Sequence, residues 1–210
     1  MDQCPHKSTC RISQVAQQYN GNYAAGYIGF SFPVHPGFVS HGITYLTRWD
    51  RMSDIRVSHA FIVENAEYCI EADMDRGVIR TPLAHYFGGA FYTYFRKPSG
   101  YSIYMAGNIV RSARMELGKP YDKALIAAHL LIGSRLGHCF NRLWKLPERL
   151  LCTIFNRNNH WICSELAAHC LRHSPFLSDQ GILRDPPDTI TPQELFEDNE
   201  VFTTWHKDTP

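Results

Sequence analysis

Several features that would assign this chain to a familiar class of protein are missing from its sequence. No charge of one sign dominates, because 21 Lys and Arg face 20 Asp and Glu, for a formal net charge of +1. A protein that binds nucleic acid through its phosphates needs a basic surface, so we expect no nucleic-acid partner. Hydrophobic residues make up 44% of the chain, which is enough to build a core and excludes intrinsic disorder.

A membrane span and a secretory signal are also missing. The longest apolar run, Ala124 to Gly133, is interrupted by His129 and is too short to cross a bilayer. Residues 1–18 are polar and lack the positive start and apolar stretch of a secretory signal. We therefore expect a cytoplasmic location in the producing cell, and any secretion would use a system that needs no signal peptide.

The seven cysteines lack the pattern of a disulfide framework or of a structural zinc site. Their number is odd and no secretory signal precedes them, so free thiols are expected. Cysteines and histidines crowd residues 4–10 and 160–173, but without the paired Cys-x-x-Cys spacing of structural zinc. Cys163 and Cys170 would lie two helical turns apart, too far for one ion. We therefore predict no metal and no other cofactor.

The hydrophobic pattern predicts a run of strands followed by a run of helices, without internal repeats. The expected strands are 27–32, 57–63, 68–72, 76–80 and 91–96. The expected helices are 37–51, 101–117, 121–136, 161–173 and a short one after Pro192. Residues 1–25 would form an N-terminal arm, and 26–210 one domain with a basic helical insertion at about 134–159. Because strands and helices are segregated, we predict an α+β fold.

Cys163 is the first candidate for chemistry. Asn158 and Asn159 are good N-cap residues, so this cysteine is expected in the first turn of a helix. There the free backbone N–H groups and the helix dipole stabilise a thiolate, which is the form in which cysteine acts as a nucleophile. A small buried hydrophobic residue is the alternative interpretation, and the sequence around Cys163 leaves both open.

Two further candidates lie on the arms of one predicted hairpin. His59 lies in the apolar strand 57–63, where a histidine is otherwise a core residue with one hydrogen bond. Glu71 lies in the returning strand, and a buried carboxylate is costly unless it is paired. If the turn is centred on Asn65 with an odd-numbered loop, His59 lies directly opposite Glu71 on the same face. We predict this odd loop, because the imidazole and the carboxylate then satisfy each other, as base and orienting residue of a triad do.

The order of these segments resembles that of a known family. Along the chain come Ser58-His59-Ala60, Ile70-Glu71-Ala72, Gly118-Lys119-Pro120-Tyr121-Asp122, Cys163-Ser164-Glu165-Leu166 and Thr191-Pro192-Gln193-Glu194-Leu195. The order resembles the circularly permuted NlpC-type branch of the papain-like cysteine hydrolases, which includes the lecithin:retinol acyltransferase-like proteins. In permuted members the histidine strand precedes the cysteine helix, as it does here. The resemblance runs from about residue 26 to residue 202.

The resemblance implies a fold and a catalytic triad. The fold would be a permuted papain-like one, in which an antiparallel, partly barrel-like sheet packs against the helix that carries the nucleophilic cysteine. Cys163 would be the nucleophile, His59 the base and Glu71 the orienting residue. Tyr121 and Asp122 would lie near the site and contact substrate.

The site also needs an oxyanion hole. The backbone N–H of Cys163 would supply one donor. Tyr45 and Tyr27 are the candidates for a second donor, and Tyr45 would then also contact substrate.

The activity that the resemblance implies is that of a cysteine peptidase or amidase. A peptide of the peptidoglycan cell wall is the first expected substrate, and the missing signal is compatible with an antibacterial effector toxin that has an immunity or delivery partner. The alternatives are a lipid acyl hydrolase or acyltransferase at a membrane surface, and a catalytically silent binding module that keeps the fold.

The block at 134–159 departs from the simpler connection that relatives often have. It sets Leu, Phe and Trp residues among five basic side chains, and its one acidic residue is Glu148. Such a block is typical of a peripheral membrane contact or an acidic partner's binding surface. A solvated surface helix that caps the fold and a lid over the active site are the other interpretations.

Overall fold

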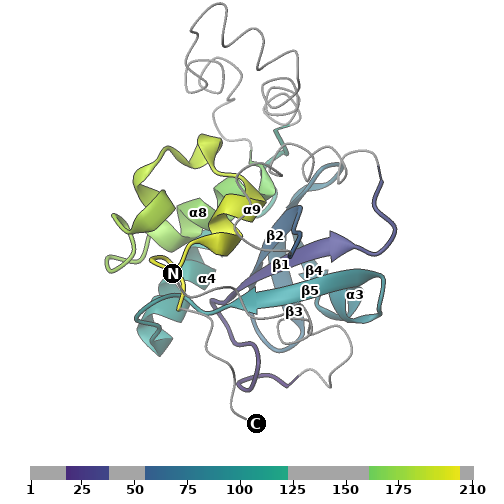
Figure 1. Ribbon diagram of the computed structural model, residues 1–210, viewed down its shortest axis with the longest axis horizontal. Coiled ribbons are helices and arrows are strands. Elements are labelled where there is room, and N and C mark those ends of the chain that lie inside the picture. Colours follow the sequence, from purple (N-terminus) through teal and green to yellow (C-terminus); the bar gives the residue numbers. More distant parts are fainter. Residues whose placement is uncertain (1–17, 38–54, 123–160, 204–210) are drawn as a thin grey trace, which may run out of the picture.

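The computed structural model describes residues 18–37, 55–122 and 161–203, and the fold is given for these ranges. Figure 1 shows a sheet with helices packed against it. The expected helix at 37–51, the block at 134–159, and most of the N-terminal arm and of the helix at 121–136 lie outside the described residues.

The sheet has five antiparallel strands in the order β4-β3-β2-β1-β5. The strands are β1 (Ile28–Pro33), β2 (His59–Val63), β3 (Tyr68–Asp73), β4 (Gly77–Pro82) and β5 (Phe91–Arg96). All five were predicted, with ends that differ by two residues at most. The sheet is open, with β4 and β5 as its edges, so it is not a closed barrel.

The helices confirm the predicted α+β class. They are α3 (Ala84–Phe87), α4 (Ile103–Met115), α8 (Cys163–Arg172) and α9 (Pro192–Glu197), with 3-10 turns η1 (Gly181–Arg184) and η2 (Pro187–Thr189). The Ser102 hydroxyl caps α4 by accepting the Met105 N–H at 3.2 Å. Gly118 follows the helix with φ +84°, a left-handed conformation that favours glycine at a helix end. The sequence pattern predicted neither α3 nor the two 3-10 turns.

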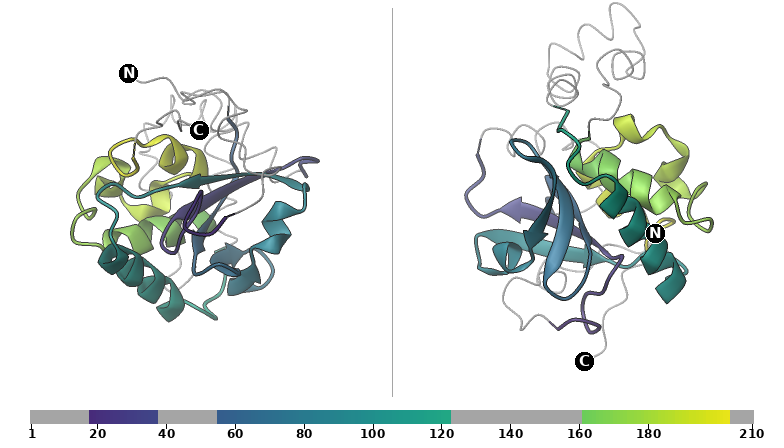
Figure 2. Two further views of the ribbon diagram at one scale, coloured as in Figure 1. Left: turned by 90° about the horizontal axis from the view of Figure 1, so that it is seen from below. Right: turned by 180° about the vertical axis from the view of Figure 1, so that it is seen from behind.

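The two faces of the sheet carry different cores. Alternate residues of a strand point to opposite faces, and Ala60 and Ile62 of β2 pack with the core formed by α4, α8 and α9. Phe61 and Val63 pack instead with an aromatic cluster that includes Tyr86 of α3. Figure 2 shows α4, α8 and α9 together on one face, with α3 on the other. No described helix is long and apolar enough to cross a membrane.

Arg96 joins the end of the sheet to the C-terminal segment. Its side chain is 2% exposed, and its guanidinium donates to the Asn199 side chain at 3.0 Å and to the Thr203 carbonyl at 3.1 Å. The guanidinium also lies against the Phe196 and Phe202 rings, at 5.7 and 5.1 Å from their centroids. These contacts hold the segment after α9 against β5, next to the core that supports α8.

Candidate active site

The β2–β3 hairpin determines how its histidine and carboxylate meet. Its ladder pairs Ile62 with Ile70 and Val63 with Cys69, and the Glu64 N–H donates to the Tyr68 carbonyl at 2.9 Å. Three residues, 65–67, therefore form the loop, which confirms the predicted odd-numbered loop and the shared face of the two candidates.

The predicted register was wrong by one pair of positions. The turn is centred on residue 66 rather than on Asn65, because the Asn65 side chain accepts the N–H groups of Glu67 and Tyr68 at 2.8 and 2.9 Å. Continued by one residue, the ladder sets Phe61 opposite Glu71. His59 is therefore a diagonal neighbour of Glu71 rather than its direct partner.

His59 and Glu71 nevertheless form a direct contact. Nε2 of His59 lies 2.6 Å from Oε2 of Glu71, and their side chains are 24% and 5% exposed. Burial would raise the pKa of Glu71, but the hydrogen bond to His59 and the charge of that ring outweigh it and lower the pKa to about 2. The carboxylate is therefore ionised at neutral pH and fixes one ring nitrogen of His59.

Cys163 is the first residue of α8, which confirms its predicted place in the first turn, although the helix begins two residues later than expected and the expected caps are wrong. The N-cap residue is Ile162, in an extended conformation with no side-chain cap, whereas Asn158 and Asn159 precede it outside the described residues. Glu165 in the first turn accepts the Ile162 N–H at 3.4 Å. Cys163 is 4% exposed, and its sulfur lies at the helix start, where backbone N–H groups favour a thiolate.

The Cys163 sulfur lies beside the His59 ring, and each group shifts the pKa of the other. Burial alone would raise the pKa of the thiol, but the charge and hydrogen bond of His59, with backbone N–H groups of Ala60 and Ser164, lower it below its ordinary value. Burial also opposes a charge on His59, but the Cys163 thiolate and the Glu71 carboxylate raise its pKa to about 10. The two groups therefore favour each other's charged forms, the thiolate of Cys163 and the imidazolium of His59.

The backbone N–H of Ala60 in β2 reaches the Cys163 sulfur from the side that faces β3. The Val63 N–H donates to the Tyr27 carbonyl at 2.9 Å on the β1 side. Since N–H groups alternate sides along a strand, that of Ala60 faces β3. The β2–β3 ladder has ended by Ile62 and Ile70, so this N–H is not needed by the ladder. The Cys163 sulfur at the start of α8 is thus placed beside the His59 end of β2.

Tyr121 and Asp122 run beside the segment that leads into α8. Tyr121 forms an isolated parallel bridge with Trp161, the Asp122 N–H donates to the Trp161 carbonyl at 3.1 Å, and the Trp161 N–H donates to the Pro120 carbonyl at 3.0 Å. The predicted helix start at Tyr121 is therefore wrong, because this bridge takes its place. Burial, and then the nearby charge of Cys163, raise the pKa of Tyr121 well above its ordinary value. The predicted proximity of these residues to Cys163 agrees with this geometry, while a role in substrate binding stays a prediction.

The two candidates for the second oxyanion-hole donor fare differently. Tyr27 lies at the Val63 end of β2, the opposite end from His59, and its ring packs edge-on against Tyr101 at 5.1 Å. Because Tyr27 lies at the other end of β2 from His59, it is not placed to donate to an oxyanion at Cys163. Tyr45 lies outside the described residues.

Tyr86 is a site residue that the sequence pattern missed. Its hydroxyl donates to Oε2 of Glu71 at 2.5 Å, the same oxygen that contacts His59. Nothing in the local sequence signals this contact, because it arises when the four-residue helix α3 folds back over the aromatic face of the sheet.

Cys163 differs from the other described cysteines, Cys69 and Cys170. Burial raises the pKa of Cys69 well above its ordinary value and that of Cys170 to about 12. Among the described cysteines, the site therefore activates Cys163 alone. Across the ranges 18–37, 55–122 and 161–203, no three His, Cys, Asp or Glu residues form a group that could hold a metal ion.

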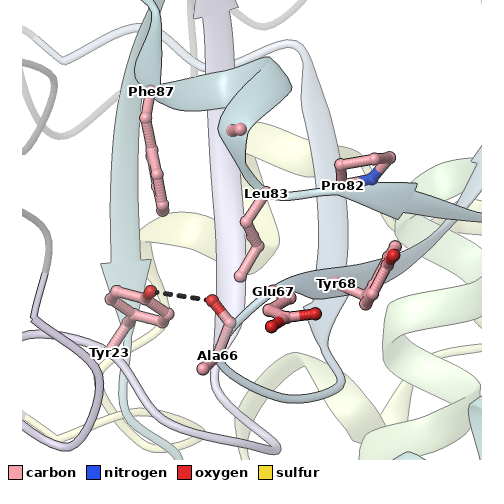
Figure 3. A pocket seen from close by; sticks show the side chains of 8 residues that line it. Tyr23, Ala66, Glu67, Tyr68, Pro82, Leu83 and Phe87 are labelled. Carbon is pink, nitrogen blue, oxygen red and sulfur yellow. Dashed lines mark hydrogen bonds between the residues drawn. The ribbon is translucent and has the colours of Figure 1, made fainter.

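A separate pocket of about 410 Å³ lies at the hairpin end of the sheet (Figure 3). It is lined by Tyr23, Ala66, Glu67, Tyr68, Pro82, Leu83, Ala84 and Phe87. Neither Cys163 nor His59 contributes to it, and its hairpin residues follow β2 at the end away from His59. This pocket is therefore distinct from the Cys163 site, although α3 borders it.

Comparison with known proteins yields no relative that would name the activity: no protein-family model matches the chain, and no curated protein matches it.

Proposed function

We propose that the chain is a cysteine hydrolase of the permuted papain-like type, in which Cys163, His59 and Glu71 cleave an acyl bond. One observation carries this proposal: a single relay joins the buried carboxylate of Glu71, the His59 ring and the thiol at the start of α8. A carboxylate that orients an imidazole beside a nucleophile is the arrangement by which hydrolases of many folds activate that nucleophile.

The proposed reaction follows from the ionisation of these groups. The thiolate of Cys163 adds to the substrate carbonyl carbon, and the Cys163 N–H stabilises the oxyanion at the helix start. The His59 imidazolium gives its proton to the leaving amine as the C–N bond breaks, leaving a thioester on Cys163. A water molecule then adds to this thioester while His59 takes its proton, and the C–S bond breaks to release the acid product, which restores the Cys163 thiolate and the His59 imidazolium. Glu71 keeps the ring in the useful orientation throughout.

An amide bond in a peptidoglycan peptide is the substrate that we propose first. The support for it is the order of the motifs around His59, Glu71 and Cys163, which resembles a branch whose members include cell-wall peptidases. Delivery as an antibacterial effector belongs to the same proposal. A lipid acyl bond is the second candidate, and the observation that favours it is the basic, aromatic composition of residues 134–159.

Digestion of purified peptidoglycan tests the proposal, with the masses of the released fragments as the readout. We expect fragments from the wild-type protein and none from Cys163→Ala. Cys170→Ala is the matched control, because it removes another buried thiol of α8 and should leave digestion unchanged. If the protein releases acyl groups from phospholipid vesicles but no fragments from peptidoglycan, the substrate is a lipid rather than a peptide. Absence of both activities, together with an unreactive Cys163, would contradict the hydrolase and leave a silent binding module.

A further inference from the structure

We propose that Tyr86 is a positioning residue of the site, which acts on His59 through Glu71; this inference rests on the proposed hydrolase function. Two donors converge on one carboxylate oxygen. Oε2 of Glu71 lies 2.6 Å from Nε2 of His59 and accepts the Tyr86 hydroxyl at 2.5 Å. The rotation of the carboxylate is therefore fixed from two directions, by the group it orients and by a group on another element.

The Tyr86 hydroxyl can act as a fixed point because the rest of its side chain is held firmly. The residue is 3% exposed, and its ring stacks on that of Phe61 with centroids 4.2 Å apart and planes 16° apart. The Phe91 ring packs on it at 5.3 Å. The backbone of α3 is held as well, since the Thr93 hydroxyl donates to the Tyr86 carbonyl at 3.0 Å.

Loss of the Tyr86 hydroxyl should weaken the interactions that join Glu71, His59 and Cys163. A hydrogen bond donated to a buried carboxylate stabilises its ionised form. Without Tyr86 the Glu71 carboxylate has one donor fewer and more freedom to rotate, so it holds the His59 imidazolium less well. The imidazolium in turn stabilises the Cys163 thiolate. The thiol pKa of Cys163 is therefore expected to rise when the hydroxyl is removed, although Tyr86 is separated from the sulfur by two residues.

The competing interpretation is that Tyr86 is a buried tyrosine that needs an acceptor and has no role beyond stability. Tyr23 provides the matched control for that case. It belongs to the same aromatic cluster, is 4% exposed, and its hydroxyl donates to the Ala66 carbonyl at 3.1 Å, near the hairpin turn. Tyr23→Phe removes a buried hydroxyl without touching the relay.

The test is the rate at which iodoacetamide alkylates Cys163 between pH 5 and 9, resolved for each cysteine by peptide mass spectrometry. Because the thiolate fraction falls tenfold for each pH unit below the thiol pKa, a rise of half to one unit in Tyr86→Phe slows alkylation on the acid limb about three- to tenfold. Tyr23→Phe should match the wild type. Thr93→Val removes the hydrogen bond that holds the backbone of α3 but keeps the Tyr86 hydroxyl. We expect it to give a smaller change in the same direction as Tyr86→Phe.

Combining Tyr86→Phe with Glu71→Gln tests whether Tyr86 acts on Cys163 through Glu71. If Tyr86 acts through Glu71, then Tyr86→Phe has no further effect on the alkylation profile in the Glu71→Gln background. An equal effect in both backgrounds, a thiol pKa that falls, or a Tyr86→Phe profile like that of Tyr23→Phe would overturn the inference. If wild-type Cys163 reacts no faster than Cys69 and Cys170 at pH 6, the hydrolase function itself fails, and the two failures are thereby distinguished.

Discussion

Val57 donates its backbone N–H to the side-chain oxygen of Gln193 at 3.0 Å, two residues before His59. The side-chain nitrogen of Gln193 donates to the Ile55 carbonyl at 2.9 Å, so one amide group binds the main chain on both sides of residue 56. Three residues before Gln193, the Ile190 carbonyl accepts the Ser164 hydroxyl at 2.6 Å. The segment 190–193 thus contacts both the chain that leads into the strand of His59 and the helix that begins at Cys163.

Replacing Gln193 by Leu should therefore destabilise the fold. The side chain is 1% exposed, and its loss leaves a buried N–H and a buried carbonyl of the 55–57 segment without their partner. Each such group costs about 1–3 kcal/mol, so for the two groups we expect a loss of about 2–6 kcal/mol in the free energy of unfolding, measured in urea. Gln180→Leu, at a partly exposed glutamine, is the control. A loss below about 0.5 kcal/mol, the usual range of surface substitutions, would show that the two hydrogen bonds of Gln193 do not stabilise the 55–57 segment.

The ionisation of the pair predicts the pH range of activity. Cys163 has a lowered thiol pKa, and His59 has a pKa raised to about 10. The thiolate–imidazolium pair therefore exists from below the ordinary thiol pKa up to about pH 10. We expect the alkylation rate of Cys163 to stay high below pH 9, where Cys69 and Cys170 are protonated and unreactive. Equal rates at the three cysteines at pH 7 would contradict the pair.

Glu71→Gln should shift the alkaline limit of hydrolysis. Gln carries no charge to stabilise the imidazolium, so the pKa of His59 falls and kcat/KM declines at a lower pH than in the wild-type protein. Glu71→Asp, which keeps the charge on a shorter side chain, should retain more of the alkaline activity. An unchanged alkaline limit in Glu71→Gln would mean that Glu71 does not act on His59.

The main site residues were predictable because each lies in a strong local pattern. His59 and Glu71 lie in apolar strands, where a polar side chain needs a partner, and Cys163 lies at the start of an apolar helix. Those patterns fix which face a residue takes. The register needed more, because the Asn65 side chain moves the turn by one residue, and this depends on loop geometry rather than on strand alternation.

Contacts between distant segments were beyond prediction from the sequence alone. Tyr86 reaches Glu71 because a helix too short to have a sequence period folds over the sheet. Gln193 was noticed as part of a family-like segment, but its two hydrogen bonds join positions more than 130 residues apart. The Tyr121–Trp161 bridge takes the place of the expected helix start at Tyr121 for the same reason, since pairing with a distant segment outweighed local propensity there.

His169→Phe should make the protein less sensitive to mild acid. Burial, and then the nearby His173, lower the pKa of His169 to about 4, and its ring packs on Trp161 at 4.6 Å. Between pH 6.5 and 4 the unfolded chain binds a proton at this residue that the folded protein does not, so stability falls as the pH falls. Phe keeps an aromatic ring against Trp161 and removes the titrating group.

The measurement is the urea midpoint of unfolding at pH 7 and at pH 4.5. We expect the drop between these values to be smaller in His169→Phe than in the wild-type protein, whereas His35→Phe, at an exposed position, should keep the wild-type drop. Glu71 does not interfere, because its pKa is lowered to about 2 and its contribution to stability is lost only as the pH falls from about 4.5 towards that value. An equal drop in both variants would show that His169 is not the residue whose burial makes the fold acid-sensitive.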